Sequence, residues 1–161
     1  MNGFSDDNYI TDQDYFGQYR YRTIPSSYNG CGWMAAYNIM HYLGIDLSFD
    51  EVRKELDGLH RLRLPGPTTM NAMRKYLNRH MPEMKETEGR NEALEALRRS
   101  QCGILRYTES GTPHFVSLIR SGSGFRFFNV ADGFEDFESD IDSFFDSRVK
   151  TGFVAAFYLN V

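Results

Sequence analysis

The chain has 161 residues, a formal net charge of −4 and a hydrophobic fraction of 41%. This length fits one domain with one core, and the mild negative charge excludes the basic footprint typical of nucleic-acid binding. The N-terminus is acidic and polar, unlike a signal peptide, and the longest apolar run, 153–159, is too short to cross a bilayer. We therefore expect a soluble, cytoplasmic protein without a membrane segment, unless an export signal has been removed.

Residues 1–24 carry aromatic side chains among acids and amides, and we expect an extended arm lying over a single domain, 25–161. The segment Asn29-Gly30-Cys31-Gly32-Trp33 then enters an apolar stripe of helical period that ends at Gly44. A cysteine in the first turn of a helix faces unpaired N–H groups and the positive end of the helix dipole, which favours a thiolate nucleophile. The other interpretation is a small apolar residue in a core helix.

Three more helices are predicted before residue 100. Ser48 and Glu51 form a capping box for a helix that ends at Gly58, and Thr69 can cap a helix that runs to Pro82. Asn91 can cap another helix, which reaches Arg99. Beyond it the period alternates, which predicts strands at 102–107, 114–119, 125–130 and 153–160 and a short helix at 141–145. Helices followed by an antiparallel sheet indicate an α+β fold.

A reactive thiol needs an imidazole to take its proton. His41 lies on the same helix as Cys31, about 15 Å away along the axis, so it cannot be the partner. His60 and His80 fall near helix ends among charged residues, where a solvated histidine is ordinary. His114 follows a turn and opens an apolar strand, a junction where catalytic side chains collect, so it is the predicted base.

A third group must orient the imidazole. If the hairpin loop is centred on Ser123, His114 lies directly opposite Asp132, within reach of an imidazole–carboxylate hydrogen bond. The rival is the Asn129 amide, which in this register opposes Ser117 on the other face of the sheet. A bulge or a two-residue turn would change the register. The alternative without catalysis is that Asp132 belongs to a turn and His114 is a capping residue.

With Cys31, His114 and Asp132 in this order, the chain resembles the papain-like cysteine peptidase superfamily, and within it the bacterial double-glycine leader peptidases that trim bacteriocin precursors. The likeness runs from about Ser26 to the C-terminus. It implies a papain-like fold and cleavage of a peptide bond in a peptide or protein substrate, without a metal or organic cofactor. Cys31 would attack the carbonyl, His114 would protonate the leaving amine, and Asp132 would hold the ring.

The chain departs from this family where relatives carry a glutamine that donates to the oxyanion, because Pro25 stands there. The backbone N–H of Cys31 could supply one donor, and Ser26, Ser27 or Asn29 the other. Three functions follow from these residues. The first is a thiol-dependent peptidase or amidase, the second an inactive relative that binds peptides or proteins, and the third another acyl transferase with a Cys-His-Asp triad.

Overall fold

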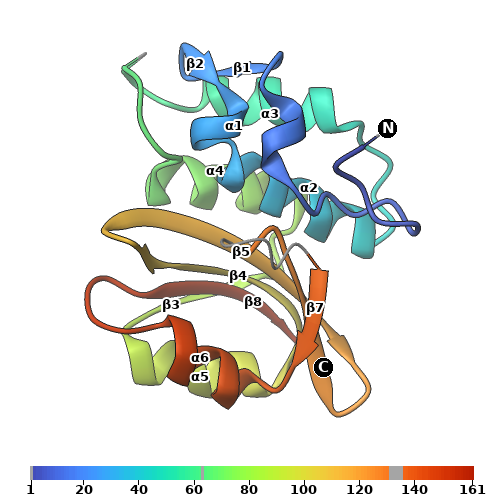
Figure 1. The fold of residues 1–161 in the computed structure, drawn as a ribbon, viewed down its shortest axis with the longest axis vertical. Coiled ribbons are helices and arrows are strands. Elements are labelled where there is room, and N and C mark those ends of the chain that lie inside the picture. The colour runs from blue at the N-terminus through green and yellow to red at the C-terminus, as the bar shows by residue number, and fades with distance from the viewer. Residues whose placement is uncertain (1, 63, 131–135) are drawn as a thin grey trace.

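The computed structural model describes residues 2–62, 64–130 and 136–161. Among these residues, four helices precede a six-stranded antiparallel sheet and lie over one of its faces, and two further helices cover the opposite face (Figure 1). The N-terminal part contains a 3-10 helix η1 (Gln13–Phe16), β1 (Arg20–Tyr21), β2 (Ile24–Pro25), α1 (Ser26–Asn29), α2 (Cys31–Tyr42), α3 (Phe49–Gly58) and α4 (Met70–His80). The remainder contains β3 (Lys85–Glu88), α5 (Arg90–Arg98), β4 (Ser100–Glu109), β5 (Thr112–Ser121), β6 (Gly124–Phe128), β7 (Asp136–Ser139), α6 (Ile141–Arg148) and β8 (Ala155–Asn160).

The predicted α+β class is confirmed, with strands in the order β3-β8-β4-β5-β6-β7. The predicted helix caps at Ser48 and Thr69 are also confirmed, since their hydroxyls accept hydrogen bonds from Glu51 N and Ala72 N, each at 3.1 Å. The cap predicted at Asn91 is wrong, because α5 begins at Arg90, one residue before Asn91, and its N-cap is Gly89. The outer strands β3 and β7 were not predicted, because a short charged strand such as β3 lacks an alternating apolar pattern.

The sheet separates two hydrophobic cores, because successive side chains of its strands point to opposite faces. Ile104 and Phe115 pack with the N-terminal helices, whereas their neighbours Leu105 and Val116 pack with α5 and α6. The sheet is therefore buried on both faces. No helix among the described residues has the length and apolar character needed to traverse a bilayer.

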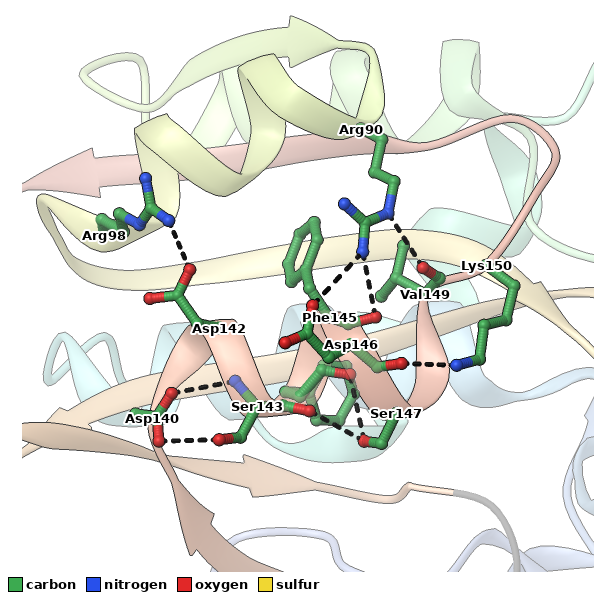
Figure 2. Close-up of polar contacts among 11 residues, drawn as sticks. Arg90, Arg98, Asp140, Asp142, Ser143, Phe145, Asp146, Ser147, Val149 and Lys150 are labelled. Atoms are coloured by element: carbon green, nitrogen blue, oxygen red, sulfur yellow. Dashed lines mark hydrogen bonds and ion pairs between the residues drawn. The ribbon is translucent and has the colours of Figure 1, made fainter.

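Helices α5 and α6 are joined by arginines on the sheet face opposite α2 (Figure 2). Arg98 forms an ion pair with Asp142, and Arg90 Nε donates to the carbonyl of Val149 at 2.9 Å. Asp140 caps α6 by accepting from Ser143 N at 2.8 Å. These contacts lie on the far side of the sheet from Cys31. They stabilise the layer of α5 and α6 that packs against the strands.

The N-terminal arm packs into the helical core, where Ile10, Phe16 and Tyr21 are fully buried. Asn38 on α2 holds it, because its Oδ1 accepts from Ile10 N at 2.7 Å and its Nδ2 donates to Ile10 O at 3.0 Å. The same Nδ2 lies 3.0 Å from Ser117 Oγ on β5. One buried amide therefore connects the arm, a helix and the central sheet.

The register of the β5–β6 hairpin differs by one residue from the predicted one. Ser121 pairs with Gly124, and the ladder ends where Ser117 pairs with Phe128. The turn therefore has two residues, of which Gly122 has a φ of 60°, typical of a tight hairpin turn. The predicted pairing of His114 with Asp132 relied on a centre at Ser123, so its premise is wrong. Asp132 itself lies outside the described residues.

We predict that Asn38→Ala lowers the free energy of unfolding by about 3 kcal/mol, because it leaves the buried backbone groups of Ile10 without partners. Asn78→Ala is the matched control, since Asn78 is an exposed residue of α4. It should change stability by less than about 0.5 kcal/mol. Urea unfolding followed by circular dichroism measures both. Equal effects of the two substitutions would contradict the role given to Asn38.

Candidate active site

Cys31 is the first residue of α2 and is 5% exposed. The next residue, Gly32, lets the helix tip approach the loop before α4, because a Cβ on Gly32 would lie 2.0 Å from Thr68 Oγ1. Thr68 is fixed in turn, since its hydroxyl lies 2.6 Å from Tyr21 OH. The glycine beside the cysteine therefore serves close packing of the helix start.

The structure brings Cys31 and His114 together, although 83 residues separate them in sequence (114 − 31). Their side chains lie close enough that each shifts the pKa of the other, through its charge and a hydrogen-bonding contact. The Nε2 atom of His114 lies 2.9 Å from the carbonyl oxygen of Asn129. Because a carbonyl can only accept, Nε2 carries a proton, which leaves Nδ1 as the ring nitrogen that can exchange a proton with the sulfur.

The surroundings of the sulfur favour the thiolate. Burial alone would raise the pKa of Cys31, and the charge of the His114 ring and its hydrogen bond are the largest influences that oppose burial. The backbone N–H groups of Phe115 and Gly32 add to this effect, so the pKa of Cys31 is lowered below that of an ordinary thiol. The candidate nucleophile is thus ionised more readily than a free cysteine.

The same contacts favour the charged imidazole. Burial disfavours the imidazolium, but the Cys31 thiolate, its hydrogen bond, the Asn129 carbonyl and the Glu109 carboxylate together outweigh burial and raise the pKa of His114. Each member of the pair therefore stabilises the charged form of the other. The ring of Tyr107 packs edge-on against the His114 ring, with centroids 5.9 Å apart, and limits its rotation.

Asn129 takes part through its backbone, which the sequence did not indicate. It lies one residue beyond β6 in the left-handed region, with φ of 61°, and its carbonyl faces His114. Its side chain points to η1, where Oδ1 accepts from Gln13 N and Nδ2 donates to Gln13 Oε1, both at 3.0 Å. The predicted pairing of Asn129 with Ser117 is wrong, because Phe128 pairs with Ser117, but the Asn129 amide binds Gln13 and not His114. Gln13 was not predicted at all.

A cleft of about 540 Å³ lies beside the Cys31–His114 pair. The part of its wall that the structure describes contains apolar surface from Ile24, Tyr28, Pro67, Pro113 and Val130. It also contains the carboxylates of Asp12, Asp14 and Glu109, and none of its described residues is a lysine or arginine. The cleft can therefore hold a chain segment next to the thiol in an acidic, partly apolar setting.

Two of the expected side-chain donors to an oxyanion are committed elsewhere. Ser26 is fully buried and its Oγ accepts from Trp33 Nε1 at 3.0 Å. Asn29 Nδ2 donates to the carbonyls of Tyr21 and Gly66, both at 2.9 Å, which uses both of its amide hydrogens. The backbone N–H of Cys31, in the first turn of α2, belongs to the class of helix N–H groups without a helical partner.

The remaining cysteine is buried in the core, and the remaining histidines have other hydrogen-bond partners. Cys102 is fully buried in β4, where burial raises its pKa to about 12. His60 bonds to the carbonyl of Leu56, His80 to Glu55, and His41 to the carbonyl of Asp7. Among the described residues, no group of three or more His, Cys, Asp or Glu side chains could hold a metal ion.

We predict that iodoacetamide modifies Cys31 with a midpoint below the pH of about 8.5 typical of a free thiol, because His114 stabilises the thiolate. His114→Gln should raise this midpoint, since a neutral amide supplies no charge. Cys102 is the internal control and should stay unmodified in the folded protein. Intact mass and peptide mapping measure both sites. A midpoint that is unchanged in a folded His114→Gln variant would contradict the pair.

Comparison of the chain with models of known protein families finds no match, and neither does comparison with curated proteins. What the site can do is therefore inferred from its residues and their chemistry. Those residues are a thiol with a lowered pKa, an imidazole fixed by a carbonyl, and a cleft beside them.

Proposed function

We propose that the protein is a thiol-dependent peptidase or amidase that acts through an acyl-enzyme intermediate. The observation that carries this proposal is that Cys31 and His114 line the same open cleft, close enough to shift each other's pKa, while the Asn129 carbonyl holds the His114 ring. The arrangement of N-terminal helices, a cysteine at a helix start and a histidine on the sheet also supports it, because the resemblance to papain-like peptidases implies this arrangement. A papain-like fold is therefore part of this proposal. Membership of the leader-peptidase group within this superfamily is part of the same proposal.

The proposed reaction begins with attack of the Cys31 thiolate on the substrate carbonyl carbon, which forms a C–S bond and an oxyanion. The backbone N–H of Cys31 donates to this oxyanion. His114 transfers the Nδ1 proton to the leaving nitrogen as the C–N bond breaks, which releases the amine. Water then loses a proton to the neutral ring and attacks the thioester, so that the C–S bond breaks and the acid leaves.

In this mechanism the Asn129 carbonyl orients the ring, a role that the sequence assigns to Asp132. A carbonyl at 2.9 Å fixes the tautomer and ring plane as a carboxylate would, but without a full negative charge. Asp132 stays a predicted contributor. The charge of the imidazolium is then balanced chiefly by the thiolate itself.

The cleft favours substrates that are neutral or basic near the scissile bond. Of the three carboxylates in the wall, that of Glu109 already has a cationic partner, because it forms an ion pair with Arg148 at 2.8 Å. Asp12 and Asp14 lie at η1, where Asp12 Oδ1 accepts from Asp14 N at 3.0 Å. With no lysine or arginine in the described wall, an acidic peptide side chain would meet like charges.

We predict a bell-shaped pH dependence of kcat/KM for peptide hydrolysis. Activity falls on the acid side as Cys31 is protonated below its lowered pKa, and on the alkaline side as His114 loses its proton above its raised pKa. The window therefore extends below the usual thiol range and above the usual histidine value of about 6.5. Cleavage of a peptide library, followed by mass spectrometry across pH, measures it.

Cys31→Ala is the decisive variant for this proposal and should lower turnover on the order of 10⁴ or more. Cys102→Ala is the matched control, because Cys102 lies away from the cleft in the core, and its turnover should remain within about threefold of the parent. If the parent cleaves no peptide but binds peptides as tightly as Cys31→Ala does, the peptidase proposal fails and the inactive binding protein is correct.

We predict that a peptide with lysine near the scissile bond is cleaved about three- to tenfold faster than one with glutamate there, owing to the acidic wall. Replacing both Asp12 and Asp14 by asparagine should reduce this ratio, and so should added salt. Asp46→Asn is the control, since Asp46 is exposed in the loop between α2 and α3. An unchanged ratio in the double variant would contradict the charge preference.

A further inference from the structure

Gln13 connects the two halves of the candidate active site. On one side its Nε2 donates to the carbonyl of Ser27 at 2.8 Å, in the helical turn that leads to Cys31. On the other side its backbone N–H and its Oε1 hold both polar atoms of the Asn129 side chain. Ser27 and Asn129 are 102 residues apart (129 − 27), so this bridge joins distant parts of the chain.

The bridge bears on His114 because Asn129 lies outside the sheet ladder. The last pair of the β5–β6 ladder is Ser117 with Phe128, so strand pairing does not fix the direction of the Asn129 carbonyl. That direction depends on a left-handed backbone conformation, φ of 61°, which asparagine tolerates better than most residues. The side-chain bonds to Gln13 are the described contacts that hold this conformation, together with a weak contact to Met34 Sδ at 3.9 Å.

Gln13 is itself held on a fixed support. Asp12 caps η1, and Asn38 binds Ile10 through two hydrogen bonds of 2.7 and 3.0 Å. Asp7 forms an ion pair with Arg126 on β6 at 2.7 Å. The arm is therefore attached both to α2 and to the strand that precedes Asn129.

We propose that Gln13 is a positioning residue for the catalytic imidazole. It acts through Asn129, whose carbonyl it holds against His114 Nε2, and so keeps Nδ1 aimed at the Cys31 sulfur. The inference rests on the proposed peptidase function, but its structural part, the coupling of Gln13 to the Cys31–His114 pair, does not require a substrate. The N-terminal arm then contributes a positioning residue to the site.

The test is the pH profile of Cys31 alkylation by iodoacetamide in Gln13→Leu, which removes the side-chain amide at similar volume. We expect alkylation at about pH 6 to slow about three- to tenfold, because a misaligned imidazole stabilises the thiolate less. Gln18→Leu is the matched control, since Gln18 is an exposed glutamine of the same arm, and its profile should be that of the parent. Thermal unfolding confirms that each variant is folded.

Asn129→Gly tests the same bridge from the other end, because glycine keeps the carbonyl and accepts a positive φ while losing the amide. It should slow alkylation as Gln13→Leu does, and the double variant should slow it no further, since both remove one bridge. For peptide turnover, kcat should fall about tenfold with little change in KM. A purely structural role would lower the melting temperature without moving the alkylation profile.

The outcomes separate this inference from the proposed function. An alkylation profile of folded Gln13→Leu and Asn129→Gly that matches the parent overturns the positioning role, whether or not the parent cleaves peptides. A shifted alkylation profile in both variants, with no peptide turnover by the parent, supports the positioning role and contradicts the proposed peptidase function. If Gln13→Leu fails to fold, Asn129→Gly decides.

Discussion

The docking of the start of α2 against β5 is the constraint on which the site depends. Cys31 meets His114 and Phe115 at one end of this contact, and Asn38 meets Ser117 further along. Two turns of helix and three residues of strand both advance about 10 Å, so the two contacts fit one alignment of helix and strand. Asn38 is fully buried, and a slip of α2 along β5 would leave its amide without partners. The polar contact in the core therefore also fixes the distance between sulfur and imidazole.

The Cys31 thiolate and the His114 imidazolium stabilise each other because both are removed from water together. Alone at this depth, the Cys31 thiol would have a raised pKa, as Cys102 does in β4. What distinguishes the two cysteines is the partner, since both are buried and one of them faces an imidazole and backbone N–H groups. A low effective dielectric penalises either charge alone but also strengthens the attraction within the pair, and with the hydrogen bonds this attraction exceeds the penalty.

The sequence indicated the groups with local signals and missed those that depend on the fold. Cys31 stood out by its helix start and His114 by its turn and strand, and the structure brings both to one cleft. The hairpin register was wrong by one residue, because residue types alone do not distinguish a two-residue turn at Gly122 from a longer loop. The carbonyl of Asn129 had no signal, since any residue has one. Gln13 reaches Asn129 across 116 residues, a contact that no local pattern encodes.

The orienting carbonyl has a consequence for the second half of the proposed reaction. The influences that raise the pKa of His114 against burial come first from Cys31, by its charge and hydrogen bond, and only then from the Asn129 carbonyl and the Glu109 carboxylate. Acylation turns the thiolate into a neutral thioester and removes the largest of them. Burial, which disfavours the imidazolium, is then opposed by fewer groups, so the pKa of the ring falls and more of His114 is in the neutral form that can accept a proton from water. A carboxylate in place of the Asn129 carbonyl would favour the imidazolium more strongly at this step, so the chemical state of Cys31 has a larger effect on the ring when the orienting group is a neutral carbonyl.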